Sequence, residues 1–187
     1  MAARFNMSPT PLDGLILITR KRMGDERGWL ERLFCVDELR EAGWQWGVAQ
    51  LNRTRTAKRG TVRGMHFQHP PHEEAKLVTC LRGEVFDVAV DIRPGSPTYG
   101  RWHGAVLSSD NTASLLIPPG FAHGFQTMTD DVEMFYVHSS AYAPEAEDGL
   151  RADDPAIGID WPLAITGQSE RDKNFRDFDT KVRGQAT

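Results

Sequence analysis

The stretch Glu84–Ile92, EVFDVAVDI, predicts a β-strand more clearly than any other part of the chain. Every second residue from Phe86 to Ile92 is apolar, and the residues between them include two aspartates. This period of two is typical of a half-buried strand. A tight turn at Arg82-Gly83 precedes the strand, and the Pro-rich and Gly-rich run Arg93–Pro97 ends it.

Similar short apolar runs, separated by Gly, Pro, Asn and Asp, extend in both directions from this strand and favour a β sandwich or barrel. The other predicted strands are Gly14–Thr19, Trp29–Phe34, Gly47–Asn52, Thr61–Gln68, Lys76–Leu81, Trp102–Leu107, Ser114–Ile117, Gly124–Met128 and Val132–Ser139. One helix is predicted over Glu38–Ala42, with Asp37 as its N-cap and Gly43 as its stop. The stretch Ser169–Asp179 is predicted to be helical or irregular.

The length of 187 residues predicts a single domain over 1–187 with a core of about 14–172, frayed from about Lys181. A net charge of −4 argues against a nucleic-acid or membrane-surface binder. No apolar run approaches the roughly 18 residues of a membrane span, and no secretory signal is visible, so a cytoplasmic location is expected. Cys35 and Cys80 form no disulfide or zinc pattern and are expected to fill the core.

The segment Gly60–Val78, GTVRGMHFQHPPHEEAKLV, places polar chemistry inside this predicted sheet. Arg63, His66 and Lys76 are charged or polar side chains within an otherwise apolar sheet. Burying such side chains is costly, so the presence of three of them calls for one common explanation. His66 is interpreted either as a general base or as a hydrogen-bonded core histidine. A base of this kind needs a carboxylate to set its tautomer, and Asp172 is one candidate.

A second motif, Pro118–His123 (PPGFAH), has the look of the later half of a cupin signature. Many cupins hold a metal ion, which needs three or four converging ligands. His66 and His69 are three residues apart, so on a strand they would face opposite sides. Lys76 stands where a further ligand would be sought, and an ammonium group is a poor neighbour for a metal. No bound metal is therefore expected.

Two further features are open to two interpretations each. Tyr136, within the run FYVHSSAY at residues 135–142, is either a core aromatic or a proton donor, and His138 on the same strand could lie at the surface. The basic cluster of residues 53–63 is either a solvated loop or an anchor for a diphosphate, because guanidinium groups match phosphate oxygens. No dinucleotide-binding fingerprint is present.

Taken together, these motifs resemble the dTDP-4-dehydrorhamnose 3,5-epimerase family, from about Gly14 to Asp172. The matching runs are Gly24–Gly28 (GDERG), Arg63–Gln68 (RGMHFQ), Lys76–Val78 (KLV), Gly83–Arg93 (GEVFDVAVDIR), Ser96–Gly100 (SPTYG), Pro119–Phe125 (PGFAHGF) and Asp153–Pro162 (DDPAIGIDWP). The combination is highly specific.

The resemblance implies an all-β fold, a cupin-like double-stranded β-helix or jelly roll with a few short peripheral helices. It implies a homodimer that needs neither metal nor cofactor. The implied substrate is a nucleotide-diphosphate sugar, an NDP-4-keto-6-deoxyhexose. The implied reaction inverts C3, C5 or both by removal and return of a proton through an enolate, as part of carbohydrate biosynthesis.

The same resemblance implies a role for individual residues. His66 matches the family base, Asp172 its carboxylate partner, Lys76 the residue that faces the C4 oxygen, and Tyr136 the acid. Tyr142 matches the aromatic residue that stacks on the nucleobase. The other substrate-contacting positions are Arg27, Gln50, Asn52, Arg63, His123, Glu147 and Arg171, the last of which replaces a family Lys.

Alternatives to this activity are a C3-only epimerase acting on another nucleotide sugar, a 3,4-ketoisomerase on a related jelly roll, and a non-catalytic sugar-nucleotide-binding or metal-binding cupin. The sequence also departs from the family. Arg32 stands where the family usually has Glu, with Glu31 displaced by one, and Leu51 interrupts the family's Gln-Asp-Asn triplet. These changes predict a weakened or shifted preference for dTDP over other nucleotides.

Overall fold

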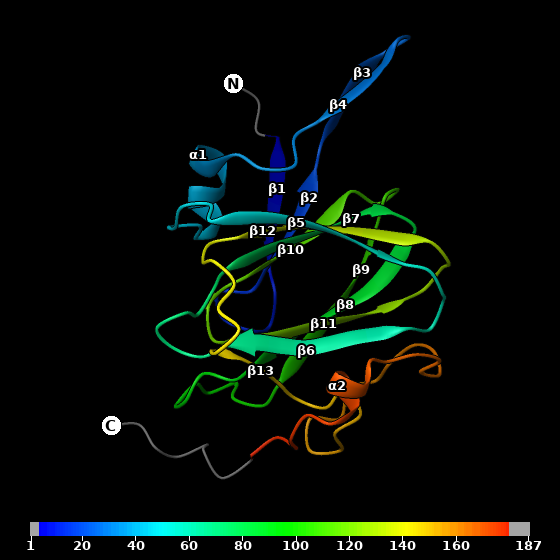
Figure 1. Ribbon diagram of the computed structural model, residues 1–187. Coiled ribbons are helices and arrows are strands. Elements are labelled where there is room, and N and C mark those ends of the chain that lie inside the picture. Colours follow the sequence, from blue (N-terminus) through cyan, green and yellow to red (C-terminus); the bar gives the residue numbers. More distant parts are fainter. Residues whose placement is uncertain (1–3, 180–187) are drawn as a thin grey trace.

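Alternating strands pair into two antiparallel sheets that lie face to face (Figure 1). The computed structural model describes residues 4–179, so the fraying predicted from Lys181 lies outside the described residues. The six-stranded sheet consists, in spatial order, of β1 (Phe5–Pro9), β2 (Ile16–Arg20), β10 (Ala113–Ile117), β7 (Lys76–Arg82), β12 (Val132–His138) and β5 (Gln50–Thr56).

The five-stranded sheet consists, in order, of β13 (Glu147–Gly149), β6 (Val62–Gln68), β11 (Phe121–Thr127), β8 (Glu84–Asp91) and β9 (Trp102–Ser108). A separate hairpin of β3 (Arg22–Asp25) and β4 (Gly28–Glu31) projects away from both sheets (Figure 1). The helical segments are short: α1 (Val36–Leu39), the 3-10 turn η1 (Arg40–Ala42) and α2 (Glu170–Lys173).

Strands that are distant in the sequence are neighbours in both sheets. β10 lies between β2 and β7, and β11 lies between β6 and β8. Such crossing antiparallel connections are typical of jelly rolls, in which two sheets enclose one interior. The predicted all-β, cupin-like jelly roll is confirmed.

Three apolar clusters hold these layers together. The cluster between the sheets contains Leu115, Phe125 and Met134. On the outer face of the six-stranded sheet, the segment of α1 and η1 packs Leu39 and Trp44 against the strands. On the outer face of the five-stranded sheet, the C-terminal stretch contributes a third cluster, which includes Ile157 and Phe178. Both sheets are therefore covered on both faces, and the packed side chains extend beyond the predicted core of 14–172.

Strand β8 corrects the interpretation of EVFDVAVDI as half-buried. Val88 and Val90 face the outer cluster under the C-terminal stretch, and they are fully buried there. The alternate set faces the interior, so Asp87 and Asp91 are also 0% exposed. The predicted period of two is confirmed, but both faces of β8 are buried, because the C-terminal stretch packs on the face that a half-buried strand would expose to solvent.

Several boundaries also differ from those predicted. The helix α1 begins at Val36 and its N-cap is Cys35, which makes no side-chain capping bond, so the prediction of Asp37 as the cap was wrong. Gly43 ends η1 with φ 96°, as predicted. Strand β5 begins three residues later than predicted, and β1, β3 and β13 were not predicted. Cys80 is buried, whereas Cys35 is partly exposed. Within residues 4–179, no helix is long and apolar enough to cross a membrane.

A pair of glycines lets β6 and β11 approach closely beside the interior. Gly64 has φ +124°, and a Cβ atom there would lie 2.5 Å from the Gly124 Cα atom. The register of the two strands shifts at this point, between His123 and Phe125. Because His66 pairs directly with His123 across these strands, the close approach sets how both imidazoles enter the interior.

We therefore predict that Gly64→Ala lowers the free energy of unfolding by about 2–5 kcal/mol, because a side chain is strained at this φ and overpacks the backbone of β11. Thermal or denaturant unfolding measures the change. Gly47→Ala is the matched control, since a Cβ atom there meets nothing within 4 Å. Equal stability of the two variants would contradict this account of the β6–β11 contact.

Candidate active site

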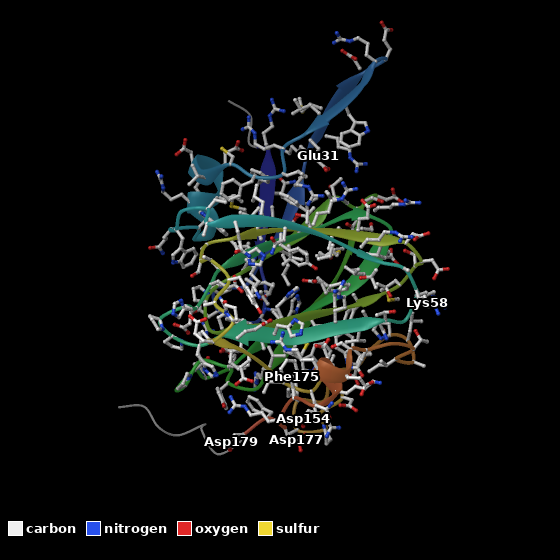
Figure 2. The ribbon with its side chains drawn as sticks, in the orientation of Figure 1. Glu31, Lys58, Asp154, Phe175, Asp177 and Asp179 are labelled. Carbon is white, nitrogen blue, oxygen red and sulfur yellow. The ribbon has the colours of Figure 1, made fainter. Side chains whose placement is uncertain are left out.

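The sandwich is open at one end, and a cavity of about 540 Å³ lies there between the sheets. Figure 2 shows side chains from both sheets filling the space between them. The residues that line the cavity are Gln50, Asn52, Thr54, Arg63, His66, Glu74, Lys76, His123, Phe125, Tyr136, His138, Tyr142 and Glu147. Most of them are polar, which is unusual for the interior of a sandwich.

The cavity has two walls, and each comes from one sheet. His66 on β6 and His123 on β11 belong to the five-stranded sheet. Lys76 on β7 and Tyr136 on β12 belong to the six-stranded sheet. Residues two apart on a strand share a face, so the apolar alternation that packs the core also aims these polar side chains inward where the strands reach the open end.

His66 and Asp172 form the predicted hydrogen bond, with 2.9 Å between His66 Nε2 and Asp172 Oδ1. Asp172 reaches β6 from α2, whose N-cap Ser169 accepts the Asp172 N–H, and its Oδ2 accepts the Gly64 N–H at 3.2 Å. The Phe175 ring packs edge-on to His66 with the ring centroids 5.7 Å apart, below β6 in Figure 2. An ionised carboxylate can only accept, so Nε2 carries a proton and neutral His66 keeps its lone pair on Nδ1.

The charge of Asp172 follows from competing effects. Burial alone would raise the pKa of its carboxyl, but the hydrogen bonds from His66 and Gly64 outweigh burial and hold the pKa below its usual value. Asp172 is therefore a carboxylate at neutral pH.

Tyr136 combines the two interpretations that the sequence left open. It packs into the cluster between the sheets, and it also lines the cavity. Its hydroxyl lies 3.5 Å from Thr54 Oγ1. Burial raises the pKa of the Tyr136 hydroxyl above its ordinary value, so at neutral pH the side chain is a neutral phenol that can donate a proton.

His123 has a carboxylate partner that the sequence reasoning missed. Its Nε2 donates to Asp87 Oδ1 at 2.8 Å, and both side chains are buried. His123 can therefore donate into the cavity through Nδ1 only when the imidazole is charged. The signal was available in β8: an aspartate on the interior face of a buried strand requires a partner.

Glu74 and His138 were also missed. Glu74 Oε1 lies 2.9 Å from Lys76 Nζ, and Glu74 Oε2 lies 2.7 Å from His138 Nδ1. His138 does not take the surface position that the sequence left open for it, because its side chain is only 10% exposed. Its spacing of two from Tyr136, and that of Glu74 from Lys76, could have placed both on the cavity face.

The rim of the cavity brings together four of the predicted substrate contacts. The Tyr142 hydroxyl donates to Glu147 Oε2 at 2.5 Å, and Arg171 contacts the same carboxylate at 2.7 Å. Gln50 accepts the Tyr142 N–H at 2.9 Å. Tyr142 as a whole residue is 53% exposed, and it lines the cavity.

The basic cluster of residues 53–63 divides between surfaces. Arg53 pairs with Glu133 on the outside of the sandwich, whereas Arg63 lines the cavity. Arg55 and Lys58 line a neighbouring hollow of about 560 Å³, together with Arg63, His66 and Arg171. Figure 2 places Lys58 at one end of the sandwich. The basic cluster therefore forms neither a single solvated loop nor a single site for a diphosphate.

Arg27 is the predicted site residue that the structure does not bring to the cavity. It lies on the projecting hairpin, pairs with Asp25 and has an 85% exposed side chain. The residues that depart from the family pattern also lie outside the cavity lining. Arg32 pairs with Glu38 and Leu51 is 58% exposed. The displaced Glu31 lies at the foot of the hairpin (Figure 2), 3.5 Å from Arg20.

Metal-ligating residues do not converge at this site. Within residues 4–179, no group of three or more His, Cys, Asp or Glu side chains is arranged to hold a metal ion. His69 lies outside the cavity lining and contacts Asp148 at 2.9 Å. Metal-independent action stays a prediction.

A comparison with protein families identifies the family of this chain. The family model described as dTDP-4-dehydrorhamnose 3,5-epimerase matches residues 9–180. The chain belongs to this family. The resemblance seen in the sequence is thereby confirmed.

Individual members of the epimerase family match most of the chain. The dTDP-4-dehydrorhamnose 3,5-epimerase of Sinorhizobium fredii is 47% identical over 80% of this chain and 77% of its own length. That of Methanothermobacter thermautotrophicus is 42% identical over 93% of this chain and 95% of its own. The crystal structure of dTDP-6-deoxy-D-glucose-3,5-epimerase RmlC from Legionella pneumophila, in complex with dTDP-4-keto-L-rhamnose, superposes with a TM-score of 0.89 at 38% identity, covering 98% of this chain and 99% of that one.

The hydrogen bonds of Asp172 predict the tautomer of His66. In Asp172→Asn, an amide NH₂ would face either the Gly64 N–H or the proton on His66 Nε2, so two donors would meet. We expect His66 to relieve this conflict by moving its proton to Nδ1, which a ¹⁵N NMR spectrum of the neutral imidazole reports.

The matched control is Asp177→Asn, because Asp177 is an exposed residue that contacts Arg151. Its His66 signals should remain those of the Nε2–H form. An unchanged Nε2–H tautomer in Asp172→Asn would contradict the assigned hydrogen bond.

Proposed function

We propose that this protein is an epimerase that inverts C3, C5 or both in a dTDP-linked 4-keto-6-deoxyhexose. One observation carries the proposal: His66 and Tyr136 line the same cavity from opposite sheets. A base on one face of a sugar ring and an acid on the other favour inversion, whereas a single group tends to return the proton to the face it left. Membership of the epimerase family supports the substrate class.

In this proposal His66 is the base. A C–H bond next to the C4 ketone is weakly acidic, and the lone pair on His66 Nδ1 accepts its proton while the C–H electrons move onto the C4 oxygen as an enolate. Asp172 holds the ring through Nε2 and stabilises the imidazolium that forms. A positioned base of this kind contributes about 10²–10⁴ in rate.

Lys76 supports the enolate. Its ammonium group lines the cavity and supplies positive charge and hydrogen-bond donors near the developing oxyanion. Charged His123 could add a second donor from β11, because Asp87 occupies only its Nε2. Removing one such donor typically costs about 3–4 kcal/mol of transition-state stabilisation.

Tyr136 completes the cycle as the acid. Its neutral phenol gives a proton to the carbon from the face opposite His66, and the enolate electrons return to form the C–H bond. The tyrosinate then regains a proton, and His66 releases one, by exchange with water. No cofactor takes part in this balance.

The nucleotide is proposed to bind at the rim. Exposed Tyr142 supports stacking of a base there, and the guanidinium groups of Arg63 and Arg171, which line adjoining hollows, support contact with a diphosphate. Gln50 and Glu147 lie beside Tyr142 at the rim, and Asn52 also lines the cavity. Arg32 and Leu51 lie outside the lining, so the predicted shift in nucleotide preference depends on contacts beyond this cavity and stays a prediction.

A homodimer is proposed from the position of Arg27. Its own cavity is formed by other strands, and the hairpin that carries it projects outward with Met23, Trp29 and Leu30 exposed by 50–61%. Apolar side chains on a projecting hairpin are suited to pack on a second copy. Arg27 would then contact substrate in the partner's cavity. A cytoplasmic location also stays a prediction.

The function is tested by incubating the protein with dTDP-4-keto-6-deoxyglucose in D₂O and following deuterium at C3 and C5 by NMR. We expect deuterium and inversion at one or both carbons, unchanged by EDTA. Tyr136→Phe should still incorporate deuterium, while its inverted product falls about 10²-fold or more, because removal and return of the proton are separate steps.

His66→Ala is the matched control, since it should lose both exchange and inversion. Exchange at C3 alone would assign the C3-only activity, and a UDP-linked substrate run beside it reports the nucleotide preference. The absence of exchange at both carbons in the wild-type protein would refute the proposed function. Normal inversion by Tyr136→Phe would remove Tyr136 from the mechanism.

The dimer is tested with differently tagged Arg27→Ala and His66→Ala chains. If Arg27 acts in the partner's cavity, each purified mixed dimer contains one intact site, and its activity should be about half that of wild type. Dimers of either variant alone should be far less active. Mixed dimers no more active than the Arg27→Ala dimer, or a monomer by light scattering, would contradict the arrangement.

A further inference from the structure

A largely buried network of polar contacts connects Lys76 to its neighbours on the cavity wall opposite His66. Lys76, Glu74 and His138 are each about 9–11% exposed at their side chains. The Glu74 carboxylate uses one oxygen for Lys76 Nζ and the other for His138 Nδ1. Asn52 Nδ2 approaches His138 Nε2 at 3.4 Å. All of these side chains line the cavity.

Each hydrogen bond of this network has only one possible assignment of donor and acceptor. Glu74 can only accept, so His138 donates from Nδ1 and its neutral ring has a lone pair on Nε2. The Asn52 amide is the donor for that lone pair. Lys76 donates to the other Glu74 oxygen. Burial alone would raise the pKa of the Glu74 carboxyl, but His138 and Lys76 outweigh it and hold the pKa below its usual value.

A carboxylate in this position needs an explanation. The cavity is proposed to bind an anionic substrate and to stabilise an enolate, and a negative charge nearby opposes both. A lysine side chain, however, is a flexible four-carbon stem that carries a point charge. Stabilisation of a transition state requires that charge to be oriented before the reaction begins.

We propose that Glu74 is a positioning residue for Lys76, and that His138 holds Glu74 in place. The assignment rests on the proposed function. Glu74 accepts one of the three ammonium N–H groups and leaves the others free to meet the C4 oxygen. His138 occupies the second carboxylate oxygen, so Glu74 cannot turn both oxygens to Lys76. The strand register brings the two partners of Glu74 together, because His138 on β12 lies directly opposite Lys76 on β7.

The first test is Glu74→Gln, which keeps the size of the side chain but removes its charge. We expect kcat for epimerisation to fall at least tenfold, while KM and the Kd for dTDP change less than twofold. Exposed Glu73, which does not line the cavity, provides the matched control Glu73→Gln. In a Lys76→Met background, Glu74→Gln should change kcat less than twofold, because its target is gone.

The second test concerns His138. His138→Asn keeps a donor close to the position of Nδ1, and His138→Leu does not. We expect kcat to fall several-fold in His138→Leu and to recover in His138→Asn. Equal losses in both variants would mean that His138 acts through something other than its bond to Glu74.

Failure of this assignment is separable from failure of the proposed function. A wild-type protein without exchange refutes the function. In an active protein, an unchanged kcat in Glu74→Gln, a parallel loss of dTDP affinity, or the same loss in the Lys76→Met background overturns the positioning role. One readout needs no activity: an ammonium held by a carboxylate acylates slowly, so Glu74→Gln should raise the acylation rate of Lys76 at least threefold by mass spectrometry. An unchanged rate overturns the assignment.

Discussion

Charge inside a β sandwich must be paired, and this constraint governs the whole open end of the molecule. Removing an ion from water costs several kcal/mol even after relaxation, and only a close partner offsets that cost. Here His66 pairs with Asp172 and His123 pairs with Asp87. Glu74 pairs with both Lys76 and His138. Each pair gives a polar or charged side chain of the cavity wall a partner within the sandwich.

The partners come from different parts of the chain, and this ties the site to the fold. Asp172 arrives from α2 near the end of the described residues, Asp87 from the neighbouring strand β8, and Glu74 from the segment that leads into β7. The outer apolar cluster that covers the five-stranded sheet is formed partly by the C-terminal stretch, which also leads to α2. Packing that appears purely structural therefore also holds a carboxylate against His66.

The division of the site between two sheets has a chemical consequence. Groups on a single sheet would approach a bound sugar from one side, whereas groups on facing sheets approach it from both. The sandwich thus suits the inversion that we propose, and its strand register decides which residues meet. The register pairs His66 with His123 and His138 with Lys76, so each wall of the cavity carries two of these side chains on adjacent strands.

Local patterns in the sequence were sufficient for most of the strands, the all-β class, the family and most residues of the candidate site, because side-chain alternation, turn residues and linked motifs are properties of neighbouring residues. They also pointed to Asp172 as the partner of His66. They were not sufficient for β8, where the covering of the second face depends on residues 150–178, nor for His138 and Glu74, whose bond joins two strands. Arg27 shows this limit most clearly. Its motif was recognisable in the sequence, but the projecting hairpin that separates Arg27 from the cavity is a feature of the tertiary structure. Alternation determines which residues share a face, and only the packing of distant segments decides what that face meets.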